Sequence, residues 1–585
     1  MRFIETMNKP KSLALVIMFV VLCAVGSAIT YRNVTNATHN AITHNPSSNR
    51  YRSGLLNVPE IHAPSGMPLV IVVSGSNYEM GYQYGLQAAP VIYQNLVLFK
   101  SRLLQAYGEE TVIKDMRVWA YYLEKYDPGL KDWLEGIRDG CRERGFDVNY
   151  LDLVALTCYP AEMWCRPSVP YPPETGVMGA ASTSLSQSLT REMPLHCTAF
   201  AATGSATKDG KPIVAITKMV PTEVMQTLIL IAFPDEGYSF IANPYAGAVV
   251  QNSGMNSAGF AWVLTAILGP PIWGVVTEVY FHYLTQYCGS PDEAIEYLIS
   301  TPRAGVTGTF VMSASNGSIC VFESNSQVFA IRKPGDAGED APFLVQTNHF
   351  IHPELRKHNV LVPGIVWQDS LYRYATAWKY VSEAARRGAI DFEFAKKMFM
   401  SDDYFEPKDW YNPEAGGQWR YNVPGSPNVL NNFPASVAQS IFFPLDRIAY
   451  FQVGTPSGIG LPAGATGEYV KFQLTNDIVT LVSKADEITF GLYSEARNLF
   501  QAELNRKAPY LTDSVIQSIK EMLDKAMLEY EHGMIKAAHA YLAMRNLGSK
   551  APDVLALWSE VLTHYAHAQL YAQMVTTRLK NLRAS

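Results

Sequence analysis

The sequence is poor in cysteine and in charge. Its 585 residues include seven cysteines, and no two of them form the Cys-x-x-Cys pairs typical of structural zinc and iron–sulfur sites. So few cysteines cannot form the disulfide framework of a small secreted domain, and their odd number leaves at least one thiol free. Charged residues make up only 17% of the chain and the formal net charge is −6, which excludes a basic surface for nucleic acid. We therefore expect no metal, cofactor or nucleic-acid partner.

Common catalytic motifs are also missing. There is no Gly-x-Ser-x-Gly elbow, no His-Glu-x-x-His, no P-loop, and no Gly-x-Gly-x-x-Gly after a strand. The glycine-rich stretch 454–467 lacks the Lys-Ser/Thr pair of a phosphate-binding loop and is better explained as a surface loop. Apolar residues (48%) and aromatic residues (12%) are plentiful, which indicates a large buried body and excludes a disordered or coiled-coil protein. The length predicts two structural units or one large elaborated domain.

The N-terminus has the pattern of a targeting segment. Lys9 and Lys11 precede an uncharged apolar run over residues 12–28, which ends in small residues. This pattern fits a secretory signal peptide within residues 1–30, and it fits equally a single-pass anchor through residues 12–28. The basic flank predicts that the body of the protein lies outside the cytoplasm in either case.

A polar stretch over residues 31–57 follows the apolar run. It is rich in Asn, Thr and Ser and predicts a flexible stalk. Two Asn-x-Thr sequons, at Asn33 and Asn36, make it a candidate site for N-glycosylation, and the protein a candidate glycoprotein.

The body changes its pattern along the chain. Residues 58–196 are mostly helical, with apolar residues at spacings of three and four. Residues 197–484 contain short β-branched and aromatic runs separated by Gly, Asn and Asp, which predict strands and hairpins. Residues 485–585 are helical again, without a fixed repeat. Because strands and helices come in separate blocks, we predict an α+β fold with mainly antiparallel sheets.

Cys197 is the most interesting cysteine. It begins a strand-like run, CTAFAATG, directly after a polar connector that ends in Pro-Leu-His. If the peptide bond before it were cut, its own α-amino group, with a reference pKa of about 8, could act as the base that activates the thiol. The spacing alone is also compatible with a small buried hydrophobic cysteine.

Seven segments in order resemble the acyl-coenzyme A:6-aminopenicillanic acid acyltransferase family, peptidase family C45, of the N-terminal-nucleophile hydrolases. The resemblance covers roughly residues 75–454. The segments are GSNYEMGYQYG at 75–85, the LEGIRDG…TCYPAE stretch at 134–162, HCTAFAATGSATKDGKPIVA at 196–215, GMNSAGFAWVLTA at 254–266, QTNHF at 346–350, Asp369-Ser-x-x-Arg373, and SVAQSIFFPLDRIAYFQVG at 436–454.

The resemblance implies an αββα sandwich that cleaves itself between His196 and Cys197. It implies that the mature enzyme attacks amide bonds, or transfers acyl groups, through a thioester on Cys197. Asn348 matches the family's Asn that supports the reacting carbonyl and the nucleophile's amine. Thr265 stands where many relatives place an oxyanion-hole Asn, so the hole is expected to be altered.

The site departs from the family pattern at a second place. Relatives carry an Asp that holds the α-amine, whereas this chain has Lys218 and Met219 there, and we name Glu223 as a substitute. Three more residues are named as support for the site. His349 could be a ligand or base, although a packed histidine is the simpler interpretation, and Arg373 is interpreted as the ion-pair partner of Asp369 on one helix face.

The sequence thus predicts an αββα hydrolase of the N-terminal-nucleophile type, with an N-terminal signal or anchor and a C-terminal helical appendage (485–585). We expect an exported or membrane-anchored, self-processing hydrolase or acyltransferase that acts on small N-acyl amides, with an acyl-coenzyme A donor as an option. The alternative is a catalytically degenerate binding or scaffold protein on the same fold. A third hypothesis gives the C-terminal helices a partner or an oligomer contact. The substrate, the acyl acceptor and the oligomeric state stay open.

Overall fold

The structure is a computed structural model that describes residues 67–178, 197–219, 227–359, 365–424, 426–431, 436–452 and 468–584. The chain divides after Asn57 into two units, and every described residue belongs to the second, Val58–Ser585. Among the described residues, no helix is long and apolar enough to span a membrane. The proposed signal or anchor, the stalk and both sequons lie outside the described residues.

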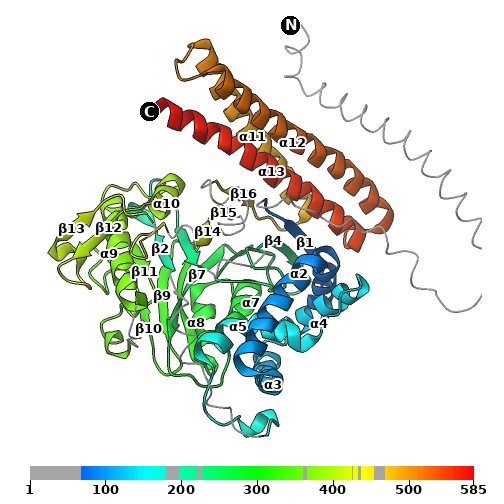
Figure 1. The fold of residues 1–585 in the computed structure, drawn as a ribbon, viewed down its shortest axis with the longest axis vertical. Coiled ribbons are helices and arrows are strands. Elements are labelled where there is room, and N and C mark those ends of the chain that lie inside the picture. The colour runs from blue at the N-terminus through cyan, green and yellow to red at the C-terminus, as the bar shows by residue number, and fades with distance from the viewer. Residues whose placement is uncertain are drawn as a thin grey trace, which may run out of the picture. The chain divides into compact units, whose positions relative to one another are not determined.

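Most of the described strands belong to two sheets, as Figure 1 shows. The larger sheet has eight strands in the order β1-β4-β5-β6-β7-β8-β9-β10, and the smaller has six in the order β11-β2-β3-β14-β15-β16. Neighbouring described strands are antiparallel except β1 and β4, which confirms the prediction of mainly antiparallel pairing. The strands of the larger sheet are β1 (Val70–Gly75), β4 (Ile229–Pro234), β5 (Phe240–Ala242), β6 (Ser253–Asn256), β7 (Phe260–Leu268), β8 (Val306–Ala314), β9 (Ile319–Ser324) and β10 (Phe329–Arg332). Those of the smaller sheet are β2 (Thr198–Ala202), β3 (Ile213–Met219), β11 (Phe343–Gln346), β14 (Ser436–Phe443), β15 (Ile448–Gln452) and β16 (Val470–Gln473).

Helices cover the outer faces of both sheets. The helices on the larger sheet are α2 (Asn77–Tyr107), α3 (Glu109–Tyr126), α4 (Pro128–Glu143), α5 (Tyr150–Cys165), α7 (Thr277–Tyr287) and α8 (Pro291–Ser300). Those on the smaller sheet are α9 (Ile365–Ala385) and α10 (Phe392–Phe399), next to the hairpin β12 (Tyr404–Pro407) and β13 (Gly417–Arg420). The C-terminal helices are α11 (Ile478–Asn505), α12 (Asp513–Leu547) and α13 (Pro552–Ala584).

Side-chain alternation along the strands produces the layers. In β1, Val70 and Val72 belong to the core between the two sheets, whereas Ile71 and Val73 belong to the core under the helices. In β2 of the other sheet, Ala199 points into the same central core. Successive side chains of a strand point to opposite faces, so each sheet buries both faces. The described residues therefore form a helix–sheet–sheet–helix arrangement, in agreement with the predicted αββα layers.

Two of the segments that carry the family resemblance contain glycines at a close contact between helices. A Cβ atom on Gly81 of α2 would lie 2.1 Å from the carbonyl oxygen of Trp133, and one on Gly140 of α4 would lie 2.2 Å from that of Tyr82. Real Cβ atoms do not come this close to backbone, so only glycine permits this contact between α2 and α4. The two glycine-containing segments thus bring the first helices of the body into direct backbone contact.

The C-terminal helices are part of the sandwich. Thr563 and Ser559 of α13 accept hydrogen bonds from the backbone N–H groups of Val70 (3.1 Å) and Val72 (2.8 Å) in β1. On the other sheet, the Gln569 side chain accepts from the N–H of Lys471 in β16 at 2.8 Å and donates to its carbonyl at 3.2 Å. Both strands are sheet edges, whose unpaired backbone groups need partners. The helical region expected from residue 485 therefore begins at Ile478 and closes the sandwich, rather than forming an appendage.

Candidate active site

Cys197 lies immediately before β2, at the end of the central core between the sheets. Its side chain belongs to that core, and the residue is only 3% exposed. Its backbone N–H donates a hydrogen bond to Oδ1 of Asn348 at 2.9 Å. This is the atom that would become the α-amine nitrogen if the chain were cut before Cys197.

The sheet register explains why Asn348 is in contact with Cys197. Strand β11 pairs with β2 in antiparallel fashion, with Gln346 opposite Ala199. Asn348 follows Gln346 by two residues, and Cys197 precedes Ala199 by two, so the same register brings them opposite each other. The Asn348 backbone N–H donates to Oγ of Ser370 at 2.9 Å, and its Nδ2 donates to the carbonyl of Ala266 at 2.9 Å.

Arg373 connects the two predicted site residues. One guanidinium nitrogen donates to the carbonyl of Cys197 at 2.5 Å and the other donates to Oδ1 of Asn348 at 3.0 Å. The predicted ion pair with Asp369 is present at 2.9 Å, within α9, and both side chains are buried. Arg373 is thus more than the structural partner of Asp369, because it also fixes the backbone at the candidate nucleophile and the amide of Asn348.

A buried network holds the loop that carries Asn348. Arg332 of β10 donates to the Val345 carbonyl at 2.7 Å and to Oε1 of Gln346 at 2.9 Å, and pairs with the Glu323 carboxylate at 2.7 Å. Gln346 in turn donates to the His349 carbonyl at 2.7 Å. Because every one of these groups is buried, a shift of the loop would break several hydrogen bonds at once.

His349 is buried against Ser370 and Thr347. Its Nδ1 lies 2.8 Å from Oγ of Ser370 and 3.2 Å from Oγ1 of Thr347. Burial lowers the pKa of His349 to about 3, and the nearby guanidinium groups of Arg373 and Arg332 contribute to this shift. A neutral imidazole with so low a pKa is a weak base, so the geometry favours the packed, structural interpretation of His349.

Thr265 of β7 lies beside the same loop. Its hydroxyl donates to the Thr347 carbonyl at 2.6 Å, and the residue is completely buried. A hydroxyl has a single hydrogen, so donation to a developing oxyanion would require this bond to break. Its role in the oxyanion hole stays a prediction.

Lys218, which stands where relatives carry an Asp, lies on β3 next to the start of β2. Thr198 of β2 pairs with Thr217 of β3, so Cys197 and Lys218 stand one step beyond this pair on the two strands. The alternation of β3 turns Lys218 toward the central core, where Cys197 lies. Its Nζ donates to the carbonyls of Asn243 and Gln251, both at 3.1 Å.

Burial gives Lys218 unusual chemistry. Desolvation lowers the pKa of Lys218 to about 7, while the negative charge of a Cys197 thiolate opposes this shift. The neutral amine keeps two N–H groups for the two carbonyls and gains a lone pair, whereas the ammonium has a third N–H, and Oγ of Ser253 lies 3.5 Å from Nζ. Neutral Lys218 can therefore accept a hydrogen bond, as the Asp of the relatives would, whereas protonated Lys218 cannot.

Some of the named residues have no described position. His196 and Glu223 lie outside the described residues, as does the side chain of Met219. Ser370, in contrast, was not predicted, although it stands inside the Asp369-Ser-x-x-Arg373 segment. Its contact with Asn348 depends on the packing of α9 against the loop after β11, which no local pattern reveals.

Comparison with known proteins confirms the family resemblance. The family model of acyl-coenzyme A:6-aminopenicillanic acid acyl-transferase matches residues 206–408. The matched range contains Asn348 and Arg373 but begins after Cys197. Over this range the chain is therefore similar to an acyltransferase family, and the match leaves the candidate nucleophile untested.

An archaeal relative and two solved structures are also similar to this chain. An uncharacterized protein of Archaeoglobus fulgidus is 24% identical over 367 residues, and the alignment spans 58% of each chain, so this chain spans less than two thirds of the relative's length. A mutant form of conjugated bile acid hydrolase from Clostridium perfringens is 11% identical with a TM-score of 0.26, covering 48% of this chain and 97% of its own. The Caenorhabditis elegans ortholog of N-acylethanolamine-hydrolyzing acid amidase is 14% identical with a TM-score of 0.28, covering 42% and 93%. Scores this low carry no argument about fold or substrate.

Proposed function

We propose that this protein is an N-terminal-nucleophile amide hydrolase or acyltransferase that works through the thiol of Cys197. The observation that carries the proposal is the hydrogen bond from the Cys197 backbone N–H to Asn348, with Arg373 bound to both residues. Such an arrangement holds a chain nitrogen and its neighbouring thiol in one orientation, which an enzyme that uses its own α-amine requires. The family match over residues 206–408 supports the same class.

The first step of this function is self-cleavage between His196 and Cys197. The thiol attacks the His196 carbonyl carbon, the peptide C–N bond breaks, and the nitrogen of Cys197 takes the proton and becomes an amine. Water then hydrolyses the thioester, which leaves a carboxylate on His196 and restores the thiol. The products should have about one third and about two thirds of the chain's 64.9 kDa.

Catalysis repeats this chemistry on a small N-acyl amide. The α-amine takes the thiol proton, the sulfur bonds to the substrate carbonyl carbon, and the departing amine receives the proton as the amide bond breaks. Water or an acceptor amine then removes the acyl group from the thioester. Charge develops on the carbonyl oxygen in both steps, and donors near Asn348 would stabilise it.

Lys218 has a place in this proposal. When protonated, it puts a positive charge in the central core beside the thiol, and an opposite charge nearby favours the thiolate. The chain thereby has a cation where relatives carry an Asp. Thr265 and Glu223 remain candidates for the oxyanion hole and for the amine contact.

The substrate class is an expectation from the family. The family's name includes an acyl-coenzyme A donor and an amine acceptor, so acyl transfer between small molecules is an alternative to hydrolysis. We also propose that the protein is exported or anchored through residues 12–28, with its body outside the cytoplasm. Addition of protease to intact cells tests this location, because a body protected until lysis would contradict it.

The test of function uses the purified full chain. Its two pieces are identified by mass and by N-terminal sequencing, which should give Cys-Thr-Ala-Phe for the larger one. The mature protein is then incubated with a panel of N-acyl amides and acyl-coenzyme A thioesters, and the Cys197 peptide is examined for an acyl mass. Cys320→Ala is the matched control, since Cys320 is another buried thiol, on β9 of the other sheet.

Each outcome decides between the two functions. An acylated Cys197 peptide, present in Cys320→Ala and absent in Cys197→Ala, supports the enzyme. An uncut, folded chain that acquires no acyl group favours the degenerate binding or scaffold protein. Turnover retained in Cys197→Ala would refute the thioester mechanism.

A further inference from the structure

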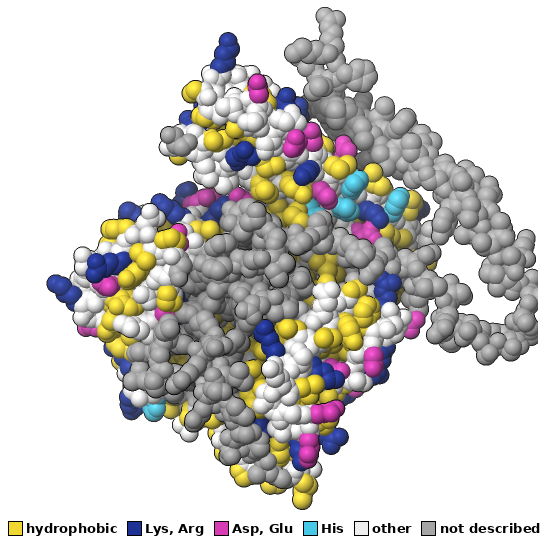
Figure 2. All heavy atoms as spheres, in the orientation of Figure 1, with side chains coloured by type: hydrophobic (Ala, Val, Ile, Leu, Met, Phe, Trp, Pro, Cys, Tyr) yellow, Lys and Arg dark blue, Asp and Glu magenta, His cyan; other side chains and the backbone are white. Residues whose placement is uncertain are grey.

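A second cluster of chemically capable side chains lies on the C-terminal helices, outside the candidate active site. Helix α12 carries Glu529 and His532, and helix α13 carries His564 and His567, each pair three residues apart. Residues three apart share one face of a helix. Figure 2 shows histidine side chains gathered at the surface of these helices.

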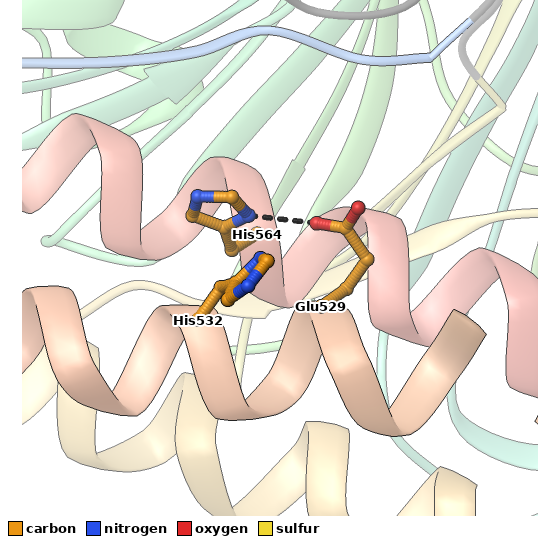
Figure 3. Close-up of side chains that lie close together, drawn as sticks. All are labelled: Glu529, His532 and His564. Carbon is orange, nitrogen blue, oxygen red and sulfur yellow. Dashed lines mark hydrogen bonds and ion pairs between the residues drawn. The ribbon is translucent and has the colours of Figure 1, made fainter. Parts of the chain in front are cut away.

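The side chains converge. The ligand atoms of Glu529, His532 and His564 all lie within 4.8 Å of one another. Figure 3 shows the two helices side by side, with the three side chains turned toward one point and His564 bound to Glu529. That bond joins Nδ1 of His564 to the carboxylate Oε2 at 2.7 Å.

His567 provides an independent observation. Its Nε2 lies 2.9 Å from the carbonyl oxygen of Pro68, and because a carbonyl only accepts, this nitrogen carries the proton. Its other ring nitrogen, Nδ1, lies 3.6 Å from Oε2 of Glu529. In the neutral imidazole Nδ1 has a lone pair, so two lone pairs face each other unless a cation or a second proton lies between them. Histidine ligands of metals characteristically bond a backbone carbonyl or a carboxylate through their other nitrogen.

The helices hold these groups firmly. Gly533, next to His532, allows Tyr565 of α13 to approach α12, because a Cβ there would lie 2.5 Å from the ring. The rings of Tyr530 and Tyr565 stack at 5.8 Å. The cluster is also accessible: the side chains of His564 and Glu529 are 26% and 22% exposed, whereas that of His567 is 4% exposed.

We propose that Glu529, His532 and His564 bind a divalent transition-metal ion of the zinc class, with Nδ1 of His567 completing the site. Two or three imidazole nitrogens and one carboxylate oxygen suit zinc, and they exclude calcium and magnesium, which take oxygen ligands. A tetrahedral ion with bonds of about 2.0–2.1 Å separates its ligand atoms by about 3.3 Å. The ligand atoms lie within 4.8 Å of one another, and the ion would take the place of the proton between Nδ1 of His564 and Oε2 of Glu529, which are now 2.7 Å apart and would separate slightly.

Such an ion would have a structural effect. It would join α12 to α13 and, through His567, join both to Pro68, just before β1. No metal is expected from the sequence, which has neither a Cys-x-x-Cys pair nor a His-Glu-x-x-His motif. Here the ligands come as two short pairs on separate helices, which only the pairing of α12 with α13 brings together.

The test uses the full chain without an affinity tag, freed of metal with a chelator, and carrying Cys197→Ala so that this thiol binds nothing. Zinc is titrated by calorimetry, and cobalt by absorption spectroscopy. We expect one ion per chain and a cobalt spectrum with ligand-field bands but no sulfur-to-cobalt charge-transfer band. Zinc should raise the melting temperature by about 2 °C or more at saturation.

Variants decide whether the proposed residues are responsible. His564→Ala should abolish saturable binding, and His567→Ala should weaken it by roughly 10–100-fold. His539→Ala is the matched control, since His539 is on the same helix α12 outside the cluster, and should bind like the parent chain. The proposal is overturned if the parent binds no zinc, if His564→Ala binds as well as the parent, or if a sulfur charge-transfer band appears. Circular dichroism of each variant shows that it is folded, and the parent's cobalt spectrum decides the question even if a variant is not.

Discussion

Oδ1 of Asn348 accepts the backbone N–H of Cys197 at 2.9 Å, although the two residues are 151 positions apart in the chain. Neither residue could reach the other without the pairing of β2 with β11. The contact holds the nitrogen that would become the catalytic amine after cleavage. The proposed chemistry depends on it.

Substitutions should distinguish the contribution of Asn348 to turnover from that of Thr265. Asn348→Ala should lower turnover by roughly 10²–10³, the usual cost of losing one oxyanion-hole donor. Thr265→Val should lower it less than about tenfold, because the hydroxyl hydrogen already binds the Thr347 carbonyl. Steady-state kinetics of the mature protein measure both, with Thr265→Ser as the control that keeps the hydroxyl. Equal losses for the two removals would place the Thr265 hydroxyl in the oxyanion hole.

Asp369 should be important for stability through Arg373. Asp369→Asn leaves a buried guanidinium without its counter-charge, which typically costs about 3–5 kcal/mol of unfolding free energy. Glu406→Gln is the matched control, because it breaks the exposed pair with Arg420 and should cost about 0–1 kcal/mol. Thermal and denaturant unfolding compare the two variants. Similar losses in both would contradict the importance of the buried pair.

Lys218 should make stability depend on pH. Its pKa is lowered to about 7 in the folded state, so between pH 7 and about 10 the unfolded chain binds more protons at this site than the folded chain does. Stability from this group therefore rises with pH, by about 1.4 kcal/mol per pH unit at most, and is lost as the pH falls toward 7. Lys218→Met removes the titrating group.

The difference in unfolding free energy between the parent and Lys218→Met removes the contributions of the other groups that titrate in this range. The advantage of the variant over the parent in unfolding free energy should shrink steadily from about pH 7 to about pH 10. A difference that does not change with pH would show that Lys218 titrates normally. Lys211→Met is the control, at a partly exposed lysine in the turn between β2 and β3 that pairs with Asp446, and it should give a flat difference.

A side chain at Gly140, where α4 contacts α2, should destabilise the protein. Gly140→Ala places a Cβ 2.2 Å from the Tyr82 carbonyl oxygen and should lower the melting temperature clearly, because two helix backbones must separate. Gly491→Ala is the matched control, since Gly491 is on α11 with open space around it. It should raise the unfolding free energy by about 0.5–1 kcal/mol, as alanine favours helix more than glycine does. A neutral Gly140→Ala would mean that the helices can shift at no cost.

The sequence predicted which parts of the body are helical and which form strands. Runs with period 3.6 predicted the helices before Cys197 and after β16, and β-branched runs predicted strands between them. The capping box at the start of α2 is also local, because it is formed by Ser76 and Glu79, three residues apart in the chain. These features depend on neighbours in the chain, so a sequence pattern can show them.

The sequence by itself determined the strands, the helices and the candidate nucleophile, together with Asn348 and the Asp369–Arg373 pair on one helix face. Only the tertiary structure decided that Lys218 faces the core beside Cys197, that Ser370 holds the Asn348 loop, and that α13 closes both sheet edges. It alone brought Glu529 and His564 within hydrogen-bond distance. The physical reason is the same in each case. These contacts follow from strand register and helix packing between segments far apart in the chain, and such packing is set by the burial of whole faces rather than by any short run of residues.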